Sequence, residues 1–106
     1  MTGTIKVTTW HYTTEDVLSI ILGHYGYDLY RISIHNRQPR IVQCRCFIWL
    51  FLHENMTYKE CSKLTGGMWH HTTIMSGIRS LRNDIEVNED IAALYGKFEK
   101  QLRGEY

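Results

Sequence analysis

Apolar residues recur at helical spacing in three stretches of the chain, which predicts three amphipathic helices. The first begins at a cap on Thr13 and loosens by Gly26, the second follows the glycines Gly66 and Gly67, and the third follows a cap on Asn88. The residues expected to be buried are Val17, Leu18, Ile21, Leu22 and Tyr25 in the first helix, Ile74, Ile78, Leu81 and Ile85 in the second, and Ile91, Leu94, Tyr95, Phe98 and Leu102 in the third. Polar side chains lie between these positions, so each helix is expected to pack on one side.

The stretch between the first two of these helices has a different pattern. In residues 41–53 apolar side chains would cover nearly the whole circumference of a helix, which favours a central helix packed on several sides. A buried strand is the alternative for the same run. Upstream, residues 28–32 could form a short turn of helix, and the polar residues 33–39 are expected to form a loop with Arg37 and Arg40 as its charges.

Thr57 and Glu60 have the spacing of a capping box, in which each side chain satisfies a backbone N–H of the other residue. A short helix is therefore expected, with Tyr58, Cys61 and Leu64 on one face. The two glycines that follow can adopt the left-handed conformation that ends a helix, and the next helix is expected to begin within residues 70–72. A short helix, a tight turn and a longer helix make the order of a helix-turn-helix.

Length and charge narrow the class of protein. The 106 residues suffice for one domain, which we place at residues 13–106, after a threonine-rich segment 1–12 that is expected to be extended or disordered. The net charge of +1 is unevenly distributed, because residues 31–82 carry eight lysines and arginines against two glutamates, a net +6, and the remainder carries −5. Such a distribution is typical of a protein with one basic face.

The cysteines and the apolar runs argue against several classes of protein. An odd number of cysteines and no hydrophobic leader favour the cytoplasm, and the apolar run 46–52 is far shorter than the ~20 residues of a membrane helix. Cys44 and Cys46 would point about 200° apart on a helix, unlike the Cys-x-x-Cys pairs of zinc sites, so we expect buried thiols and neither a metal nor a cofactor. Cys61 and His70 have no orienting group or oxyanion site, so we expect no enzyme and no small-molecule substrate.

The sequence His71-Thr72-Thr73-Ile74 is similar to the signature Asp-His-Thr-Thr-Val at the front of the recognition helix in a known family. That family is the C-terminal DNA-binding domain of the bacterial chromosomal replication initiator DnaA. The resemblance covers residues 13–102, and the Ile-Val-Gln-Cys-Arg of residues 41–45 stands where the family starts its central helix with Ile-Val-Arg-Pro-Arg. Residues 14–25, 28–29 and 36–40 resemble its opening helix, short second helix and basic loop.

The resemblance implies an all-α, Trp-repressor-like helix-turn-helix domain of about five to six helices that binds double-stranded DNA, in origin binding during DNA replication or in transcription-related regulation. The residues implied as DNA contacts are His70, His71, Thr72, Thr73, Ser76, Arg37, Arg40, Lys63, Arg79 and Arg82. Arg37 and Arg40 would contact the minor groove or the DNA backbone. Phosphates would be held by Lys59, Lys63, Arg79 and Arg82. Independently of the family, hydroxyls can pair with either type of base, and a helix N-terminus attracts phosphate. A replication or regulatory protein is a further candidate partner, and no membrane is expected.

The chain departs from the family at several points. Trp69 and His70 stand where the family has Arg-Asp, the turn before His71 is one residue longer, and the basic loop has two arginines in place of a cluster. The usual recognition sequence of the family cannot therefore be assumed. No phosphate-binding Gly-x-x-x-x-Gly-Lys-Ser/Thr loop occurs either, so we expect a regulator or a phage-type or mobile-element protein that has no ATPase of its own.

A second class of function stays open, a helical protein-interaction module that keeps this fold without binding DNA. The near-neutral net charge and the three tryptophans and seven tyrosines support it, and solvent-facing Trp69 and Tyr58 would favour it. Several residues also have simpler roles, since the histidines of the turn could merely be exposed, Thr72 and Thr73 could cap the helix, and the loop arginines could be only solvated. We expect Trp69 to pack over the turn.

Overall fold

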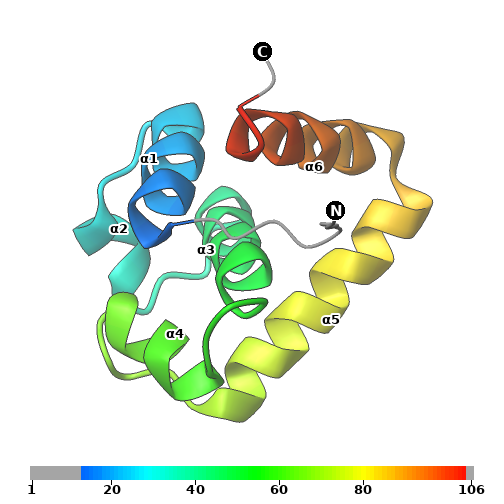
Figure 1. Ribbon diagram of the computed structural model, residues 1–106. Helices are drawn as coiled ribbons and strands as arrows, with labels where there is room; N and C mark the ends of the chain where they lie inside the picture. The colour runs from blue at the N-terminus through cyan, green and yellow to red at the C-terminus, as the bar shows by residue number, and fades with distance from the viewer. Residues whose placement is uncertain (1–12, 105–106) are drawn as a thin grey trace, which may run out of the picture.

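The computed structural model describes residues 13–104, which form six α-helices and no strand (Figure 1). The helices are α1 (Thr14–Tyr25), α2 (Leu29–Ser33), α3 (Pro39–Leu52), α4 (Tyr58–Leu64), α5 (His71–Val87) and α6 (Glu89–Leu102). The predicted all-α class is confirmed, while the prediction for residues 1–12 lies outside the described residues. Within the described range, no helix is both long enough and apolar enough to cross a bilayer.

Helix α3 lies at the centre of the molecule (Figure 1). It packs against α1 and α2 on one side and against α5 on another, while α6 lies across α1 and α5. Ten of its fourteen residues are buried, which is why its sequence shows no polar stripe. The run is helical, so the central helix is confirmed and the alternative of a buried strand is rejected. It is apolar nearly all round because other helices cover it on several sides.

The predicted loop at residues 33–39 is wrong at both ends. Ser33 belongs to α2, where its hydroxyl donates to the carbonyl of Leu29 at 2.7 Å. Pro39 opens α3, because proline needs no N–H partner in the first turn and its fixed φ suits a helix start. Only residues 34–38 form the loop, so Arg40 is a helical residue of α3.

The predicted helix caps are confirmed. The side chains of Thr13, Thr57 and Asn88 each accept from backbone N–H groups in the first turn of α1, α4 and α6, and Glu60 completes the capping box of α4. The apolar residues predicted for α1, α5 and α6 lie in the core or pack against its edge. These caps and stripes depend only on residues close together in the sequence, so they follow directly from it.

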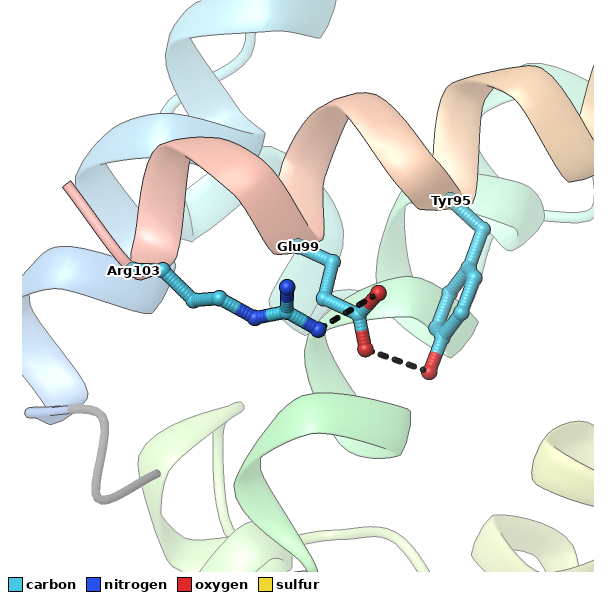
Figure 2. A network of polar contacts seen from close by, with 3 residues as sticks. All are labelled: Tyr95, Glu99 and Arg103. Atoms are coloured by element: carbon cyan, nitrogen blue, oxygen red, sulfur yellow. Dashed lines mark hydrogen bonds and ion pairs between the residues drawn. The ribbon is translucent and has the colours of Figure 1, made fainter. Parts of the chain in front are cut away.

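Helix α6 is held mainly by its apolar face. The Tyr95 hydroxyl donates to Glu99 Oε2 at 3.4 Å, and Glu99 Oε1 pairs with Arg103 Nη2 at 3.2 Å (Figure 2). Both side chains of this ion pair are 31% exposed, so the pair contributes at most about 0.5 kcal/mol. The ion pair lies within the end of α6, whereas Phe98 is fully buried against Phe47 of α3, at a ring-centroid distance of 5.1 Å, and so joins α6 to the core.

Two helical glycines should respond in opposite ways to alanine. A Cβ on Gly96 would meet no atom within 4 Å, so Gly96→Ala should raise the free energy of unfolding by about 0.5–1 kcal/mol through helix propensity. A Cβ on Gly77 would lie 3.0 Å from Cys46 Sγ and 3.3 Å from the Trp49 ring, so Gly77→Ala should lower it by about 1–2 kcal/mol. Urea denaturation of both variants tests this, and a gain from Gly77→Ala would show that α5 does not press closely on α3.

Candidate nucleic-acid interface

The turn between α4 and α5 ends in a histidine cap. His70 Nδ1 accepts from the Thr72 backbone N–H at 3.3 Å and lies 2.8 Å from the Thr72 hydroxyl oxygen. Accepting at Nδ1 places the proton of the neutral ring on Nε2. The N-cap of α5 is therefore His70, and neither Thr72 nor Thr73 has that role, which leaves the Thr73 hydroxyl without a hydrogen-bond partner among residues 13–104.

The first turns of α5 present a polar surface. Ile74, Ile78 and Leu81 are buried as predicted, and Ile85, the fourth residue of the predicted stripe, is half-buried. The side chains that face solvent here are those of His71, Thr72, Thr73, Ser76, Arg79, Ser80, Arg82 and Asn83. Imidazole and hydroxyl groups at the start of an exposed helix can donate to or accept from base edges and phosphates.

On one side of α5 lies a groove of about 400 Å³ that we call the loop groove. Its lining residues are His35, Asn36, Arg37, Val42, Arg45, Trp69 and Thr73. Arg37 also lines a hollow further along α5, beside Gly77 and Ser80. Two predicted contact residues from distant parts of the chain, Arg37 and Thr73, are thus brought together.

A second groove, of about 370 Å³, lies beside His71, which projects about 200° away from Thr73 around α5, so it flanks the other side of the helix start; we call it the α4 groove. Its lining residues are Tyr58, Lys59, Ser62, Lys63, Gly67, Trp69, His70 and His71. The rings of His70 and His71 lie 4.5 Å apart between centroids. Two lysines of α4 therefore share a groove with the histidines at the start of α5.

Two predicted cations have partners elsewhere in the protein. Arg40 Nη1 donates to the carbonyl of Tyr25 at 2.8 Å, and its guanidinium lies 5.2 Å from that ring centroid. Arg82 Nη2 lies 3.3 Å from His53 Nε2, beside the end of α3. Arg79, by contrast, is exposed and makes no ion pair or hydrogen bond with residues 13–104. Of these three cations, Arg79 is the one most available to a ligand.

Trp69 packs over the turn, as predicted, and is 8% exposed. Its indole N–H donates to the carbonyl of Thr65 at 2.7 Å, and its backbone N–H donates to Ser62 Oγ at 3.1 Å. The indole N–H of Trp49 donates to Thr65 Oγ1 at 3.1 Å, and the two tryptophan rings meet edge to face. Side chains of α3 and α4 thus fix the backbone that leads into α5.

Arg45 has a role that the sequence did not indicate, since it counted there only as one more basic charge. It is 4% exposed, and its guanidinium donates to the carbonyls of Ile32 at 2.8 Å, Ile34 at 3.1 Å and Asn36 at 3.4 Å. Its Cζ also lies 4.2 Å from the centroid of the Trp69 ring. Burial lowers the pKa of Arg45. An arginine in the middle of an apolar run was the one signal that could have suggested a buried guanidinium.

The three cysteines are core residues, as predicted. Burial raises the pKa of Cys44 to about 12 and that of Cys46 and Cys61 to about 11. Very little reactive thiolate is therefore expected near neutral pH, which makes these thiols poor nucleophiles in the folded state. Within residues 13–104, no three His, Cys, Asp or Glu side chains gather closely enough to hold a metal ion.

Comparisons of the chain with protein families, curated proteins and solved structures give no match. Its class therefore rests on its own architecture, a six-helix all-α domain in which α4, a six-residue turn at 65–70 and α5 follow in helix-turn-helix order. The two grooves lie on either side of the start of α5.

Proposed function

We propose that this protein binds double-stranded DNA in a sequence-dependent manner through α4, the turn and the start of α5. One observation carries the proposal. The first turns of α5 are exposed and rich in hydroxyls, and they are flanked by two grooves, each of which is lined by cationic side chains. The loop groove contributes Arg37, and the α4 groove contributes Lys59 and Lys63. This is the arrangement that a helix needs if it enters the major groove between two phosphate backbones.

The roles within the interface follow from side-chain chemistry. Thr73 and Ser76 are short and exposed, so they are proposed to contact base edges, while His71 and Thr72 at the helix start contact bases or phosphates. Arg79 and the lysines of the α4 groove are proposed to hold phosphates, which fixes the register of the protein on the duplex. Arg37 projects from a loop beside α5 and is proposed to contact the backbone or the minor groove.

The resemblance to the DnaA C-terminal domain supports the proposal, because it implies the same helix order around the His-Thr-Thr sequence. Trp69, which replaces an arginine of that family, is buried in the turn. A buried indole leaves no side chain at this position for a base contact, so we expect the preferred DNA sequence to differ from the box of the initiator. The protein would act as a DNA-binding module for replication or regulation.

The protein-interaction alternative receives less support. Solvent-facing Trp69 and Tyr58 would have favoured it, but Trp69 is buried and Tyr58 is half-buried against the core. Hot-spot aromatics must be accessible before they can enter a pocket of a partner. We therefore do not propose it as a second function and treat it as one outcome of the DNA-binding test.

The proposal is tested by fluorescence anisotropy on duplexes at two salt concentrations. A duplex with the box of the initiator, a random duplex and a duplex selected from a random pool would be compared. We expect salt-sensitive binding to all three and the tightest binding to the selected duplex. The absence of binding to any duplex at low salt would overturn the proposal and direct attention to protein partners.

Two substitutions should separate base contacts from phosphate contacts. Arg79→Ala should weaken binding to every duplex and reduce the salt slope by about 1, because one phosphate contact is lost. Thr73→Ala should cost about 1–3 kcal/mol on the selected duplex and little on the random one. Lys97→Ala, an exposed charge change on α6 away from both grooves, is the matched control and should leave binding unchanged. Equal losses on both duplexes from Thr73→Ala would contradict a role in base recognition.

A further inference from the structure

We infer that Arg45 is a positioning residue for DNA recognition, because it holds the loop that carries Arg37 and the turn that leads into α5 in one fixed arrangement. This inference rests on the proposed function. We call Arg45, its three carbonyl acceptors and the Trp69 ring the arginine clamp. No residue of the clamp is proposed to contact DNA itself.

The loop side of the arginine clamp consists of backbone carbonyls. The guanidinium donates to Ile32 at the end of α2 and to Ile34 and Asn36 in the loop, so its acceptors span five consecutive residues. Bonds from a charged donor are stronger than those from a neutral one, and the planar guanidinium fixes their directions. Arg37 follows directly after the last acceptor, so the backbone beside it is anchored to α3.

The turn side of the arginine clamp is the Trp69 ring. The guanidinium lies 4.2 Å from its centroid, within the range of a cation–π interaction, and the ring of His35 from the loop lies 4.5 Å from it. Trp69 donates in turn to Ser62 in α4 and to Thr65, the residue that follows α4. The guanidinium of Arg45 and the ring of His35 thus both contact Trp69, the residue just before the N-cap of α5.

Stability alone gives a weak reason for this arrangement. Among residues 13–104 no carboxylate pairs with Arg45, although its guanidinium is almost completely buried. A buried charge carries a large desolvation cost, and an apolar side chain of similar size is often at least as stabilising. What the guanidinium provides beyond an apolar side chain is a set of directed bonds to the loop.

Three members of the arginine clamp, Asn36, Arg45 and Trp69, line the loop groove together with Arg37 and Thr73. If Arg37 contacts one part of a duplex and Thr73 another, their separation must match the DNA, and each mismatch reduces discrimination between sequences. Loosening the clamp should therefore reduce the preference for the selected duplex much more than it reduces the non-specific, phosphate-driven binding.

The test uses the full chain and three variants. Arg45→Met keeps the length of the side chain but removes every directed bond, and Arg45→Lys keeps the charge but not the fork of donors. Phe98→Leu is the control for lost stability, because its ring contacts in α1 and α3 include no residue of the clamp. Each variant is measured well below its Tm, where circular dichroism shows full folding.

Two readouts are needed. The first is the ratio of Kd values for the random and the selected duplex, which we expect to fall about tenfold or more in both Arg45 variants and to stay unchanged in Phe98→Leu. The second needs no DNA and is the hydrogen exchange of two backbone amides, Gln38 in the loop and Trp69 in the turn, which donate to Asn36 Oδ1 and Ser62 Oγ. Both amides should exchange faster in Arg45→Met and neither in Phe98→Leu.

The two readouts distinguish failure of the clamp from failure of DNA binding. If the wild-type chain binds no duplex, the proposed function fails, and so does the recognition role of Arg45 that rests on it. If the chain discriminates between duplexes and Arg45→Met still does so with both amides loosened, the positioning role is overturned while DNA binding stands. Faster exchange at Gln38 alone would overturn the coupling of loop and turn.

Discussion

Replacing Gly66 with alanine should lower the free energy of unfolding by about 2–4 kcal/mol. Gly66 has a φ of +105°, which side chains with a Cβ rarely adopt. Its Cβ would also lie 2.9 Å from the carbonyl oxygen of Ser33 and 3.0 Å from Ser33 Cβ. The turn and the end of α2 are in contact there, so one of the two backbone segments must move.

The neighbouring glycine supplies the control for this prediction. Gly67 also has a positive φ, +79°, but a Cβ there would meet nothing within 4 Å. Gly67→Ala should therefore cost only about 1 kcal/mol, from backbone conformation. Urea denaturation gives the free energy of unfolding of each variant, and the difference between the two values measures the cost of the close approach to Ser33. Equal losses would show that the turn does not press against α2.

Truncating Trp49 to alanine should cost about 3–5 kcal/mol, the range for a large aromatic side chain removed from a packed core. Trp49 is 2% exposed, meets the ring of Trp69 edge to face, and lies against Gly77 of α5. A small domain has a total stability of only about 5–15 kcal/mol. We therefore expect a large fall in Tm, measured by circular dichroism.

Two further variants separate the parts of this effect. Trp49→Phe keeps an aromatic ring but removes the N–H that donates to Thr65 Oγ1, so it should cost about 1–2 kcal/mol. Tyr30→Ala removes an aromatic side chain that is 74% exposed and should change stability by less than about 0.5 kcal/mol. If Trp49→Ala cost no more than Tyr30→Ala, the packing of α3 against the turn and α5 would be contradicted.

Features that depend on near neighbours in the sequence could be predicted. The caps at Thr13, Thr57 and Asn88 join a side chain to a backbone group two or three residues away, so their spacing was sufficient. Helix α3 begins at Pro39, two residues before the predicted start at residue 41, because proline is a favourable first residue of a helix as well as a common loop residue. His70 was missed as the cap of α5, since histidine is not among the preferred capping residues.

Features that depend on distant contacts could not be predicted. The exposed face of α5 followed from periodicity, but the partners of Arg40, Arg45 and Arg82 lie 9 to 29 residues away along the chain. Their charges looked equivalent in the sequence, yet one guanidinium is buried, two are bound to other parts of the protein, and Arg79 faces solvent. Which arginines can meet a ligand is decided by tertiary structure.

The buried thiols described above can report local unfolding of the protein. Cys46 is 7% exposed and lines the hollow beside Gly77, but Cys44 in α3 and Cys61 in α4 are fully buried, so a thiol reagent reaches these two only when their helices separate from the core. Their separate labelling rates distinguish a brief detachment of α4 from a global opening of the whole domain. A ligand bound over α4 and the start of α5 should slow the labelling of Cys61 more than that of Cys44. The labelling rate of Cys61 would then report how much of the protein is bound.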